Sequence, residues 1–339
     1  MTADAASPKA DPAQTHLVGE FKHTSPLLAC RFDPSGQFAF ATAQDNTIQR
    51  WNIASGKATP LVGHDSWVRS ALAFHPSGST LYSGGYDGRV IWWDVTSEAP
   101  GPQRTIEAHR GWVRAVAVSP DGNLLATCGN DNLVKIWNAV DGTQVQECFG
   151  HANHVYNVAF HPDGRSLVSG DLKGVVRHWD LATGEQLRHL DAGSLWKYDE
   201  GFGADIGGVR AMAFSSDGGL LACGGISEVS NAFAGVGTPQ VVVFDFAKGE
   251  KIQQLASQAK LKGPITGVKL HRDGFVIGAV GGGDGGHLLF WKTDQPNEFF
   301  HLKLPDVARD LDLHPDGLRL LTPHMDGMLR LWQMTAKAK

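Results

Sequence analysis

The sequence has few cysteines and no long apolar run, and each absence excludes a class of protein. Its four cysteines stand singly without a CxxC pair, so we expect four reduced, buried thiols and neither a metal cluster nor a disulfide scaffold. No stretch reaches the ~18 consecutive apolar residues that span a bilayer. The amino terminus lacks the basic start and apolar core of a signal peptide. A cytoplasmic protein without a membrane partner is therefore predicted.

Charge is also scarce. Charged residues make up 19% of the chain against 42% apolar residues, and the formal net charge is −5. This composition allows a large core and excludes disorder over most of the chain. It gives no general attraction to nucleic acid, and no basic strip with interleaved aromatics is present. We therefore expect no nucleic acid as the main ligand.

Glycine and tryptophan, by contrast, are abundant and regularly placed. The 41 glycines favour many short strands joined by turns. An aromatic residue followed by a polar one recurs at Trp51, Trp93, Trp137, Trp179, Phe244, Trp291 and Trp332. Successive gaps are 42, 44, 42, 65, 47 and 41 residues. Self-similarity at a period of ~40–45 residues indicates stacked four-stranded blades.

Each unit repeats one order of signals. In the second unit "HDSWVRSALAF" is followed by the turn "HPSG", then "STLYSGG", "YDG" and "RVIWWDV". The third and fourth units carry "HRGWVRAVAV" with "SPDG" and "HANHVYNVAF" with "HPDG". Three short alternating strands separated by Pro/Gly/Asp turns are predicted, with a fourth strand after the aromatic pair.

This pattern resembles the WD-repeat (WD40) family of β-propellers, whose best-known member is the β subunit of heterotrimeric G proteins. The resemblance implies an all-β fold, a single seven-bladed propeller over residues 15–333 with four-stranded antiparallel blades. It also implies that the segment 15–22 completes blade seven, because the last repeat ends at Trp332. Residues 1–14 are expected to form a disordered tail, and residues 334–339 a short C-terminal tail.

The resemblance further implies buried polar tetrads in which indole, hydroxyl, imidazole and carboxylate satisfy one another. Two blades match the full tetrad, with His64, Ser83, Asp87 and Trp93 in the second and His109, Thr127, Asp131 and Trp137 in the third. The other blades match in part. The first has Ala41 at the hydroxyl position, the fourth has Lys173 at the aspartate position with Asp171 two residues early, and the seventh lacks the histidine.

A Ser, His and Asp trio also suggests a hydrolase. Here the same trio recurs with a tryptophan at the same spacing in two blades, which a single catalytic site does not require. We therefore expect a structural role for these residues, no catalytic residue, no cofactor and no metal. Trp92, next to Trp93, is expected to point to the other face of its strand and pack on the adjacent blade.

In this family, partner contacts favour the narrow top face, formed by the loops before each first strand and between the second and third strands. The matching positions are the third and fifth residues after the loop histidine and the residue before the turn aspartate. In the second to fourth blades they predict a partner-binding set of Trp67, Arg69, Tyr86, Trp112, Arg114, Asn130, His154 and Tyr156. Alignment of the less regular blades on their strand ends adds Arg210 and Arg309 at the second of these positions.

Four arginines of this set would make a positive ring on an acidic protein: Arg69, Arg114, Arg210 and Arg309. Trp, Tyr and Arg are enriched in binding hot spots, and guanidinium groups bind carboxylates and phosphates bidentately. The alternative is that the tryptophans only wedge between blades while the arginines pair with nearby acids such as Asp65.

The 65-residue gap predicts two insertions in blade five, at 190–205 and 226–239. Both connections open on the top face, and the first carries Trp196, Tyr198 and Phe202 among acidic residues. Long loops in a compact fold are usually functional or mobile. We expect a raised lip beside the arginine ring, or else an insertion without a binding role.

Three functions remain open from the sequence. The first is a non-enzymatic scaffold that binds protein or peptide segments on its top face. The second is a reader of a phosphorylated or otherwise anionic ligand through the arginine ring. The third is a hydrolase-type enzyme at the channel mouth, for which Asp199, Glu200 and Asp205 are the obvious carboxylates. The partner and the oligomeric state do not follow from the sequence.

Overall fold

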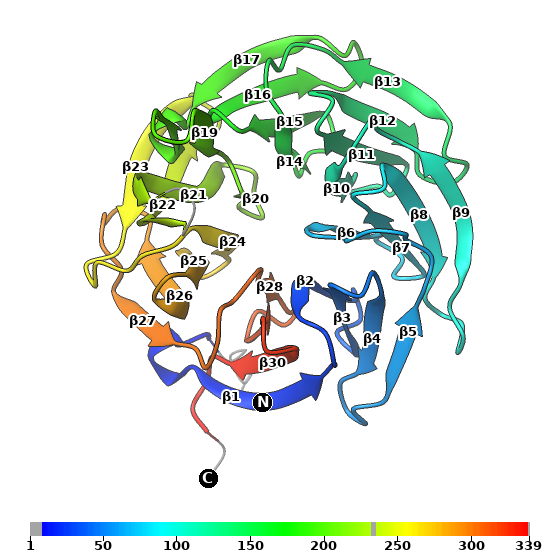
Figure 1. The fold of residues 1–339 in the computed structure, drawn as a ribbon, viewed down its shortest axis with the longest axis horizontal. Helices are drawn as coiled ribbons and strands as arrows, with labels where there is room; N and C mark the ends of the chain where they lie inside the picture. Colours follow the sequence, from blue (N-terminus) through cyan, green and yellow to red (C-terminus); the bar gives the residue numbers. More distant parts are fainter. Residues whose placement is uncertain (1–8, 232–234, 338–339) are drawn as a thin grey trace, which may run out of the picture.

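Short apolar runs, each ended by a Pro/Gly/Asp turn, form the strands of the protein. The computed structural model describes residues 9–231 and 235–337. Seven four-stranded antiparallel sheets follow one another around a common axis, as Figure 1 shows. The all-β, seven-bladed propeller expected from the sequence is therefore confirmed.

Consecutive strands build the first six blades from the inside of the ring outward. Blades 1 to 3 consist of β2 (Leu27–Phe32), β3 (Phe38–Ala43), β4 (Ile48–Asn52) and β5 (Ala58–Leu61); β6 (Ala71–Phe74), β7 (Thr80–Gly84), β8 (Arg89–Asp94) and β9 (Pro102–Glu107); β10 (Val113–Val118), β11 (Leu124–Gly129), β12 (Val134–Asn138) and β13 (Gln144–Cys148). Blades 4 to 6 consist of β14 (Val155–Phe160), β15 (Ser166–Asp171), β16 (Val175–Asp180) and β17 (Gln186–Asp191); β20 (Ala211–Phe214), β21 (Leu220–Asn231), β22 (Val236–Asp245) and β23 (Glu250–Ala256); β24 (Ile265–His271), β25 (Phe275–Gly282), β26 (Gly285–Lys292) and β27 (Phe300–Lys303).

Blade 7 joins the two ends of the chain. Its inner strands are β28 (Asp312–Leu313), β29 (Arg319–Pro323) and β30 (Met328–Gln333), and its outer strand is β1 (His16–Lys22), which pairs antiparallel with β30. The Phe21 side chain is buried in the cluster that joins blades 7 and 1. The predicted closure of the ring by the N-terminal segment is therefore confirmed (Figure 1).

The chain ends extend the ordered fold beyond the predicted boundaries. Residues 12–14, expected in a disordered tail, form the short 3₁₀ helix η1 (Pro12–Gln14), and the Asp11 amide donates to the Met334 carbonyl at 2.7 Å. Met334 itself is fully buried between blades 6 and 7. The rest of the two predicted tails, residues 1–8 and 338–339, lies outside the described residues.

The hydrophobic core is divided into seven clusters within the described residues, and each lies between two neighbouring blades. Trp93, for example, packs with Phe40 of blade 1, while Trp92 packs with Trp137 of blade 3 and donates from Nε1 to the Ala139 carbonyl at 2.7 Å. The two adjacent indoles therefore serve opposite faces of blade 2, as expected. Since every blade depends on two neighbours, an open ring would expose core at its two ends.

Histidines in the turns between first and second strands link neighbouring blades. Gly36 and Gly317 have positive φ values in these turns, and each carbonyl lies within hydrogen-bond distance of Nε2 of a histidine from the preceding blade, His314 at 3.0 Å and His271 at 2.6 Å. A Cβ on Gly36 would lie 2.1 Å from the His314 ring, so only glycine fits there. The repeated "HPDG" histidine is therefore a blade-to-blade contact.

The tetrads of blades 2 and 3 form as the resemblance implies. In blade 2, Trp93 Nε1 donates to Ser83 Oγ at 2.8 Å, His64 Nε2 lies 2.7 Å from the same hydroxyl, and His64 Nδ1 lies 3.0 Å from Asp87. In blade 3 the corresponding contacts join Trp137 to Thr127, His109 to Thr127 and His109 to Asp131, at 2.9, 2.7 and 2.8 Å. In each tetrad the aspartate carboxylate accepts from the histidine Nδ1–H. The other ring nitrogen of the neutral histidine, Nε2, is then an acceptor, so the Ser or Thr hydroxyl donates to it.

Two blades that the sequence marked as incomplete contain a hydrogen-bonded relay of indole, hydroxyl and imidazole. In blade 4, Asp171 lies 2.9 Å from His151 Nδ1, and Ser169 bonds both His151 and Trp179 at 2.7 Å. The side chain of Asp171 therefore fills the role expected four residues after the hydroxyl, where Lys173 stands. The prediction of a degraded blade 4 was wrong.

The missing histidine of blade 7 is supplied by His324. Its Nε2 lies 2.8 Å from Thr322 Oγ1, which accepts from Trp332 Nε1 at 2.8 Å, and its Nδ1 lies 2.9 Å from the Asp306 carbonyl. His324 stands two residues after the hydroxyl, as Asp171 does in blade 4. Blades 2 and 3 have Gly85 and Gly129 at this position, where a Cβ would clash with the tetrad histidine.

Stability is expected to fall in mild acid because of His324. Burial and the nearby Arg330 charge lower its pKa to about 4, below the ordinary 6.5. The unfolded chain therefore takes up the proton first as pH falls through 6.5, and stability is lost progressively down to about pH 4. For one such histidine we expect the free energy of unfolding to drop by about 2 kcal/mol between pH 7.5 and 5. Urea unfolding at the two pH values measures this, and an equal drop in His324→Gln would contradict it.

Candidate functional site

The predicted top-face residues come together because two loops of each blade are hydrogen-bonded to each other. The Tyr86 amide donates to the Trp67 carbonyl at 2.9 Å, and the Asn130 amide donates to the Trp112 carbonyl at 3.1 Å. Trp67 and Trp112 stay 42% and 40% exposed, while Val68 and Val113, the next residues along the chain, are buried. Each indole therefore keeps a part of its surface that a partner could contact.

Blades 2, 3 and 4 share a group of four aromatic residues and one arginine, here called the aromatic rim: Trp67, Tyr86, Trp112, Arg114 and Tyr156. The rings of Tyr86, Trp112 and Tyr156 lie around the Arg114 guanidinium, and Trp67 joins them through its carbonyl, which accepts from the Tyr86 amide. The Tyr86 ring is stacked on Trp112 with centroids 3.9 Å apart and planes 2° from parallel. The Arg114 guanidinium lies 4.5 Å from the Trp112 centroid and 4.6 Å from that of Tyr156. These cation–π contacts hold the guanidinium between the rings of Trp112 and Tyr156.

Side-chain hydrogen bonds fix the edge of the aromatic rim. Arg114 Nε donates to Asn130 Oδ1 at 2.7 Å, so this predicted residue orients the guanidinium between the rings. His154 Nδ1 lies 3.2 Å from Asn132 Oδ1 instead, and joins blade 4 to the turn of blade 3.

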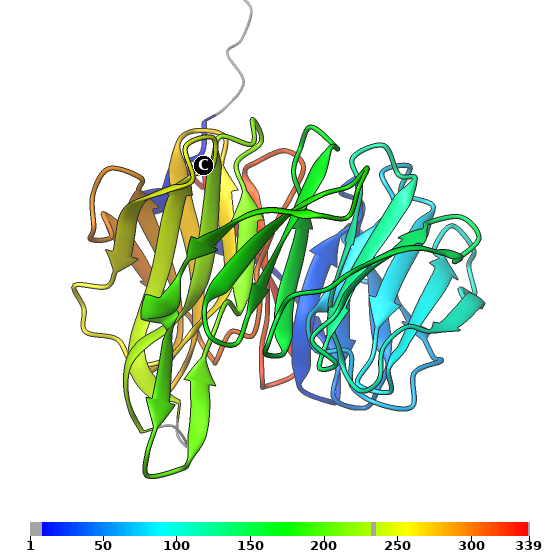
Figure 2. The ribbon, with the colours of Figure 1, turned by 90° about the horizontal axis from the view of Figure 1, so that it is seen from above.

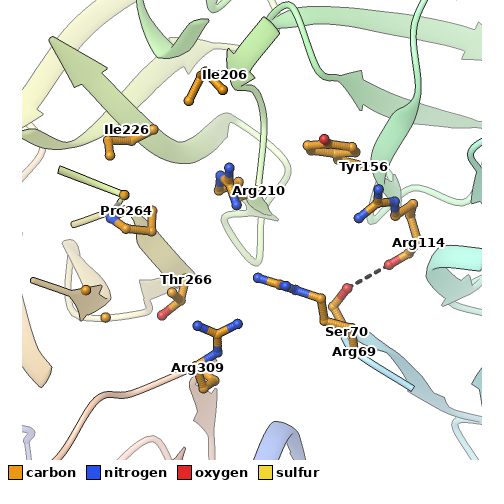
Figure 3. A pocket seen from close by; sticks show the side chains of 13 residues that line it. Arg69, Ser70, Arg114, Tyr156, Ile206, Arg210, Ile226, Pro264, Thr266 and Arg309 are labelled. Carbon is orange, nitrogen blue, oxygen red and sulfur yellow. Dashed lines mark hydrogen bonds between the residues drawn. The ribbon is translucent and has the colours of Figure 1, made fainter. Parts of the chain in front are cut away.

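A pocket of about 370 Å³ opens beside the aromatic rim and contains all four predicted arginines. Figure 3 shows Arg69, Arg210 and Arg309 directed toward one space, with Arg114 beside Tyr156 at its edge. Its lining comes from blades 2 to 7 and from the blade 5 insertions: Arg69, Ser70, Arg114, Tyr156, Ile206, Arg210, Ile226, Gly235, Pro264, Thr266, Gly281, Gly282 and Arg309.

No carboxylate among the described residues pairs with these four arginines. Asp65, the acid proposed as their partner, lies against Arg89 instead, at 2.5 Å. Burial and the charges of Arg69 and Arg210 lower the pKa of Arg309 to about 10. Burial, with Arg69 and Arg114, also lowers the pKa of Arg210. The guanidinium groups therefore repel one another, and Arg309, with a pKa of about 10, stays protonated at neutral pH.

Cations deeper along the ring axis are neutralised. Arg31 lies 2.7 Å from Asp310, and Lys269 lies 2.7 Å from Asp312. Burial disfavours the Arg31 charge, but Asp310 and Asp312 outweigh it and raise its pKa. The inner strands thus carry matched charges, while the pocket above them carries an excess of positive charge.

The two insertions of blade 5 form one wall of this pocket. The first contains η2 (Gly193–Leu195) and the hairpin of β18 (Trp196–Asp199) and β19 (Ala204–Gly207), and the second lengthens β21 and β22. Lys197 Nζ donates to the Val229 carbonyl at 2.8 Å and ties the two together. The hairpin projects from one face of the ring (Figure 2).

The bounds of the first insertion need correction, because Asp191 ends β17 and the hairpin continues to Gly207. Residues 232–234 of the second lie outside the described residues. Tyr198 and Phe202 are exposed, as expected, whereas Trp196 is half-buried and donates from Nε1 to Asp205 at 2.8 Å. Ile206 and Ile226 bring both insertions to the pocket, so they lie beside the arginines.

Sequence reasoning missed the contribution of blade 6. Pro264, Thr266, Gly281 and Gly282 line the pocket. The two glycines belong to the run "AVGGGDGGH" of residues 279–287. A Cβ on Gly281 would lie 2.0 Å from the Ala308 carbonyl, so this run lets the chain that carries Arg309 approach closely. The run of glycines itself was the sequence signal for this contribution of blade 6.

Several of the residues considered for catalysis are already engaged within the chain. The tetrad hydroxyls of Ser83 and Thr127 are fully buried and accept from tryptophan indoles, so no substrate reaches them. Asp205 accepts from Trp196 and lies 3.6 Å from Lys173. Within residues 9–231 and 235–337, no three His, Cys, Asp or Glu side chains are grouped to hold a metal ion.

The described part of the chain contains no helix that is long and apolar enough to cross a membrane. All four cysteines are free and buried, as predicted. Burial raises the pKa of the Cys223 thiol, which keeps it protonated.

Comparison with known proteins agrees with the repeats. The family "WD domain, G-beta repeat" matches residues 15–52, 57–94, 100–138 and 142–180. The chain is 28% identical over 144 residues to the uncharacterized WD repeat-containing protein C126.01c of Schizosaccharomyces pombe, covering 40% of this chain and 39% of that protein. It is 29% identical over 152 residues to coronin-2A of Bos taurus, covering 41% and 28%.

A third relative is the p21-activated protein kinase-interacting protein 1-like of Danio rerio. It is 31% identical over 132 residues, which cover 39% of this chain and 33% of the relative. The matched segment is thus well under half the length of each of these three proteins.

Proposed function

We propose that this chain, a member of the WD40-repeat family built as a seven-bladed propeller, is a non-enzymatic scaffold that binds segments of partner proteins on its top face. WD40 propellers generally bind other proteins, and the name of the zebrafish relative describes a protein that interacts with a kinase. The observation that carries the proposal for this chain is the aromatic rim. It exposes two indoles next to an arginine that is already ordered by its neighbours.

Preorganisation explains why such a surface binds. Burying an exposed indole contributes a large contact area, and the rings of Tyr86 and Trp112 lose little freedom because they are stacked before binding. Trp, Tyr and Arg dominate interface hot spots for the same reason. A cytoplasmic location and the absence of a membrane or nucleic-acid partner remain part of the proposal.

Replacing the two exposed indoles tests the scaffold directly. The double variant Trp67→Ala/Trp112→Ala is expected to weaken partner binding at least about tenfold, because each side chain supplies contact area at the centre of the rim. Quantitative capture of partners, followed by titration of one purified partner, measures this. Phe149→Ala is the matched control, since this ring is also exposed but lies after the outer strand of blade 3. Equal affinities for the double variant and the wild type would contradict the proposal.

The alternative, recognition of an anionic ligand, is favoured by the unpaired arginines of the pocket. It is compatible with the scaffold, because the pocket and the aromatic rim share Arg114 and Tyr156.

A further inference from the structure

Three guanidinium groups converge on one space without a partner. The side chains of Arg69, Arg210 and Arg309 donate no hydrogen bond to any other described residue, and Arg210 Nε is buried without an acceptor. A buried donor that lacks an acceptor costs free energy, and like charges at close range add to that cost. The folded protein therefore holds donors and positive charge ready at this position.

Arginines elsewhere in the chain show that this arrangement is exceptional. Arg89, Arg319 and Arg330 each lie within 3.0 Å of a carboxylate, and Arg31 is paired with Asp310 inside the ring. Among the described arginines that are not exposed, Arg69, Arg210 and Arg309 are the ones that lack both a carboxylate and a hydrogen-bond acceptor. Arg104, Arg110 and Arg165 also lack such a partner, but they are exposed. An anion from outside would supply the acceptor that the chain itself does not provide.

The amount of charge favours a dianion over a single carboxylate. A carboxylate carries one charge and suits one bidentate guanidinium, so it would leave most of the repulsion between three arginines in place. A phosphate monoester carries about −1.5 to −2 at pH 7 and offers three strong acceptor oxygens. It offers three oxygens as acceptors to Arg69, Arg210 and Arg309, whereas a carboxylate offers two.

The other lining groups agree with a phosphate on an organic stem. The two hydroxyls are already engaged, since Ser70 Oγ donates to the Arg114 carbonyl at 2.7 Å and Thr266 Oγ1 lies 3.2 Å from the carbonyls of Ala279 and Ala308. The arginines therefore supply the free donors. Ile206, Ile226, Pro264 and Tyr156 form largely apolar walls against which a stem would pack (Figure 3).

We propose that the pocket lined by Arg69, Arg210 and Arg309 binds a phosphate monoester, presented on a side chain of a partner segment that lies across the aromatic rim. This inference rests on the proposed scaffold function and names the chemistry of its ligand. Arg114 joins the two parts, because it lines the pocket and contacts the Trp112 ring.

Titration with matched probes tests the ligand chemistry. Fluorescence polarisation would compare labelled degenerate peptide mixtures whose fixed central residue is phosphotyrosine, phosphoserine, tyrosine, serine or glutamate. At least one phosphorylated mixture is expected to bind about tenfold or more tightly than its unphosphorylated and glutamate counterparts, and less tightly as salt is raised. Equal binding of the phosphorylated and unphosphorylated mixtures would overturn the proposal.

Variants then place the phosphate. Arg69→Gln and Arg309→Gln are each expected to lose about tenfold in affinity for the phosphorylated mixture. Arg110→Gln, an exposed arginine on the same side of blade 3 but outside the lining, is expected to change nothing. If both pocket variants kept full affinity, with folding checked by thermal unfolding, the placement of the phosphate at these arginines would be refuted.

Small probes and the rim variant separate this inference from the scaffold function. Phenyl phosphate and O-phosphoserine, measured by calorimetry, are expected to bind wild type and Trp67→Ala/Trp112→Ala alike, while the peptides bind the rim variant more weakly. Binding of the small monoesters with no preference for phosphorylated peptides would refute a peptide source and assign the pocket to a free phosphorylated metabolite. If the arginine variants lost peptide binding and Trp67→Ala/Trp112→Ala did not, the aromatic rim would be refuted as a peptide contact, while the phosphate pocket would remain supported.

Discussion

Deleting residues 1–22 is expected to lower the free energy of unfolding by about 5 kcal/mol or more, because β1 carries the contacts that close the ring. The deletion removes the pairing of β1 with β30 from His16 to Lys22, the buried ring of Phe21, and the ion pair between Glu20 and Arg330 at 2.8 Å. It also converts β30 into an open edge next to an exposed core face. We expect the truncated chain to associate as well as to unfold more readily.

Chemical denaturation and size-exclusion chromatography of the full and truncated chains measure both effects. A synthetic peptide of residues 9–22 should restore stability when added in trans, since strand addition needs only the free edge of β30. The same peptide with Phe21→Asp is the matched control and should not restore it, because the charge would be buried between blades 7 and 1. An unchanged unfolding midpoint after truncation would show that blade 7 holds without its outer strand.

The ring itself was predictable because its signals are repeated. Seven aromatic residues recur along the chain, with five of the six gaps between 41 and 47 residues, and each fills an equivalent interface between two neighbouring blades. One misread unit therefore does not change the predicted number of blades. The N-terminal segment was predictable as the closing strand because residues 15–22 read as a spare strand before the first repeat, and β30 pairs with this strand. A periodic sequence therefore predicts the architecture when every repeat packs against its neighbours in the same way.

The variant tetrads were not predictable by matching positions alone. Asp171 and His324 each stand two residues after the tetrad hydroxyl, a spacing that no other blade uses for the relay. Strand geometry explains the result, because residues two apart point to the same face of a strand. Ser169 and Asp171 both belong to β15, so both side chains reach His151. The alternation rule, applied in place of a fixed spacing, would have found them.

The arginine pocket was predictable only in part. Its four arginines follow from repeated loop positions, and partner binding by these residues stays a prediction. The convergence of three of them, and the absence of neighbouring carboxylates, depends on how six blades face the axis. Pro264, Thr266 and the glycines of blade 6 carry no repeated signal, because they contribute backbone and small side chains.

Replacement of the buried Asp171 is expected to be the most damaging single substitution in blade 4. Asp171→Ala removes the partner of His151 Nδ1 and also the acceptor that holds the amides of Lys173 and Val175, at 2.9 and 3.0 Å. His151 would then be buried without a partner for one nitrogen. We expect a loss of about 3 kcal/mol in the free energy of unfolding.

Two further substitutions make this test specific. Asp171→Asn keeps an acceptor oxygen and should lose less, because His151 can still donate to it. Lys173→Ala changes the position at which the other blades carry their aspartate, yet it should cost no more than about 0.5 kcal/mol, since the Lys173 ammonium makes only partly exposed contacts, with Asp205 and over the Trp196 ring. Urea unfolding of the three variants ranks them. If Asp171→Ala were no less stable than Lys173→Ala, the relay of blade 4 would contribute nothing to the fold, and the two-residue spacing would have no structural role.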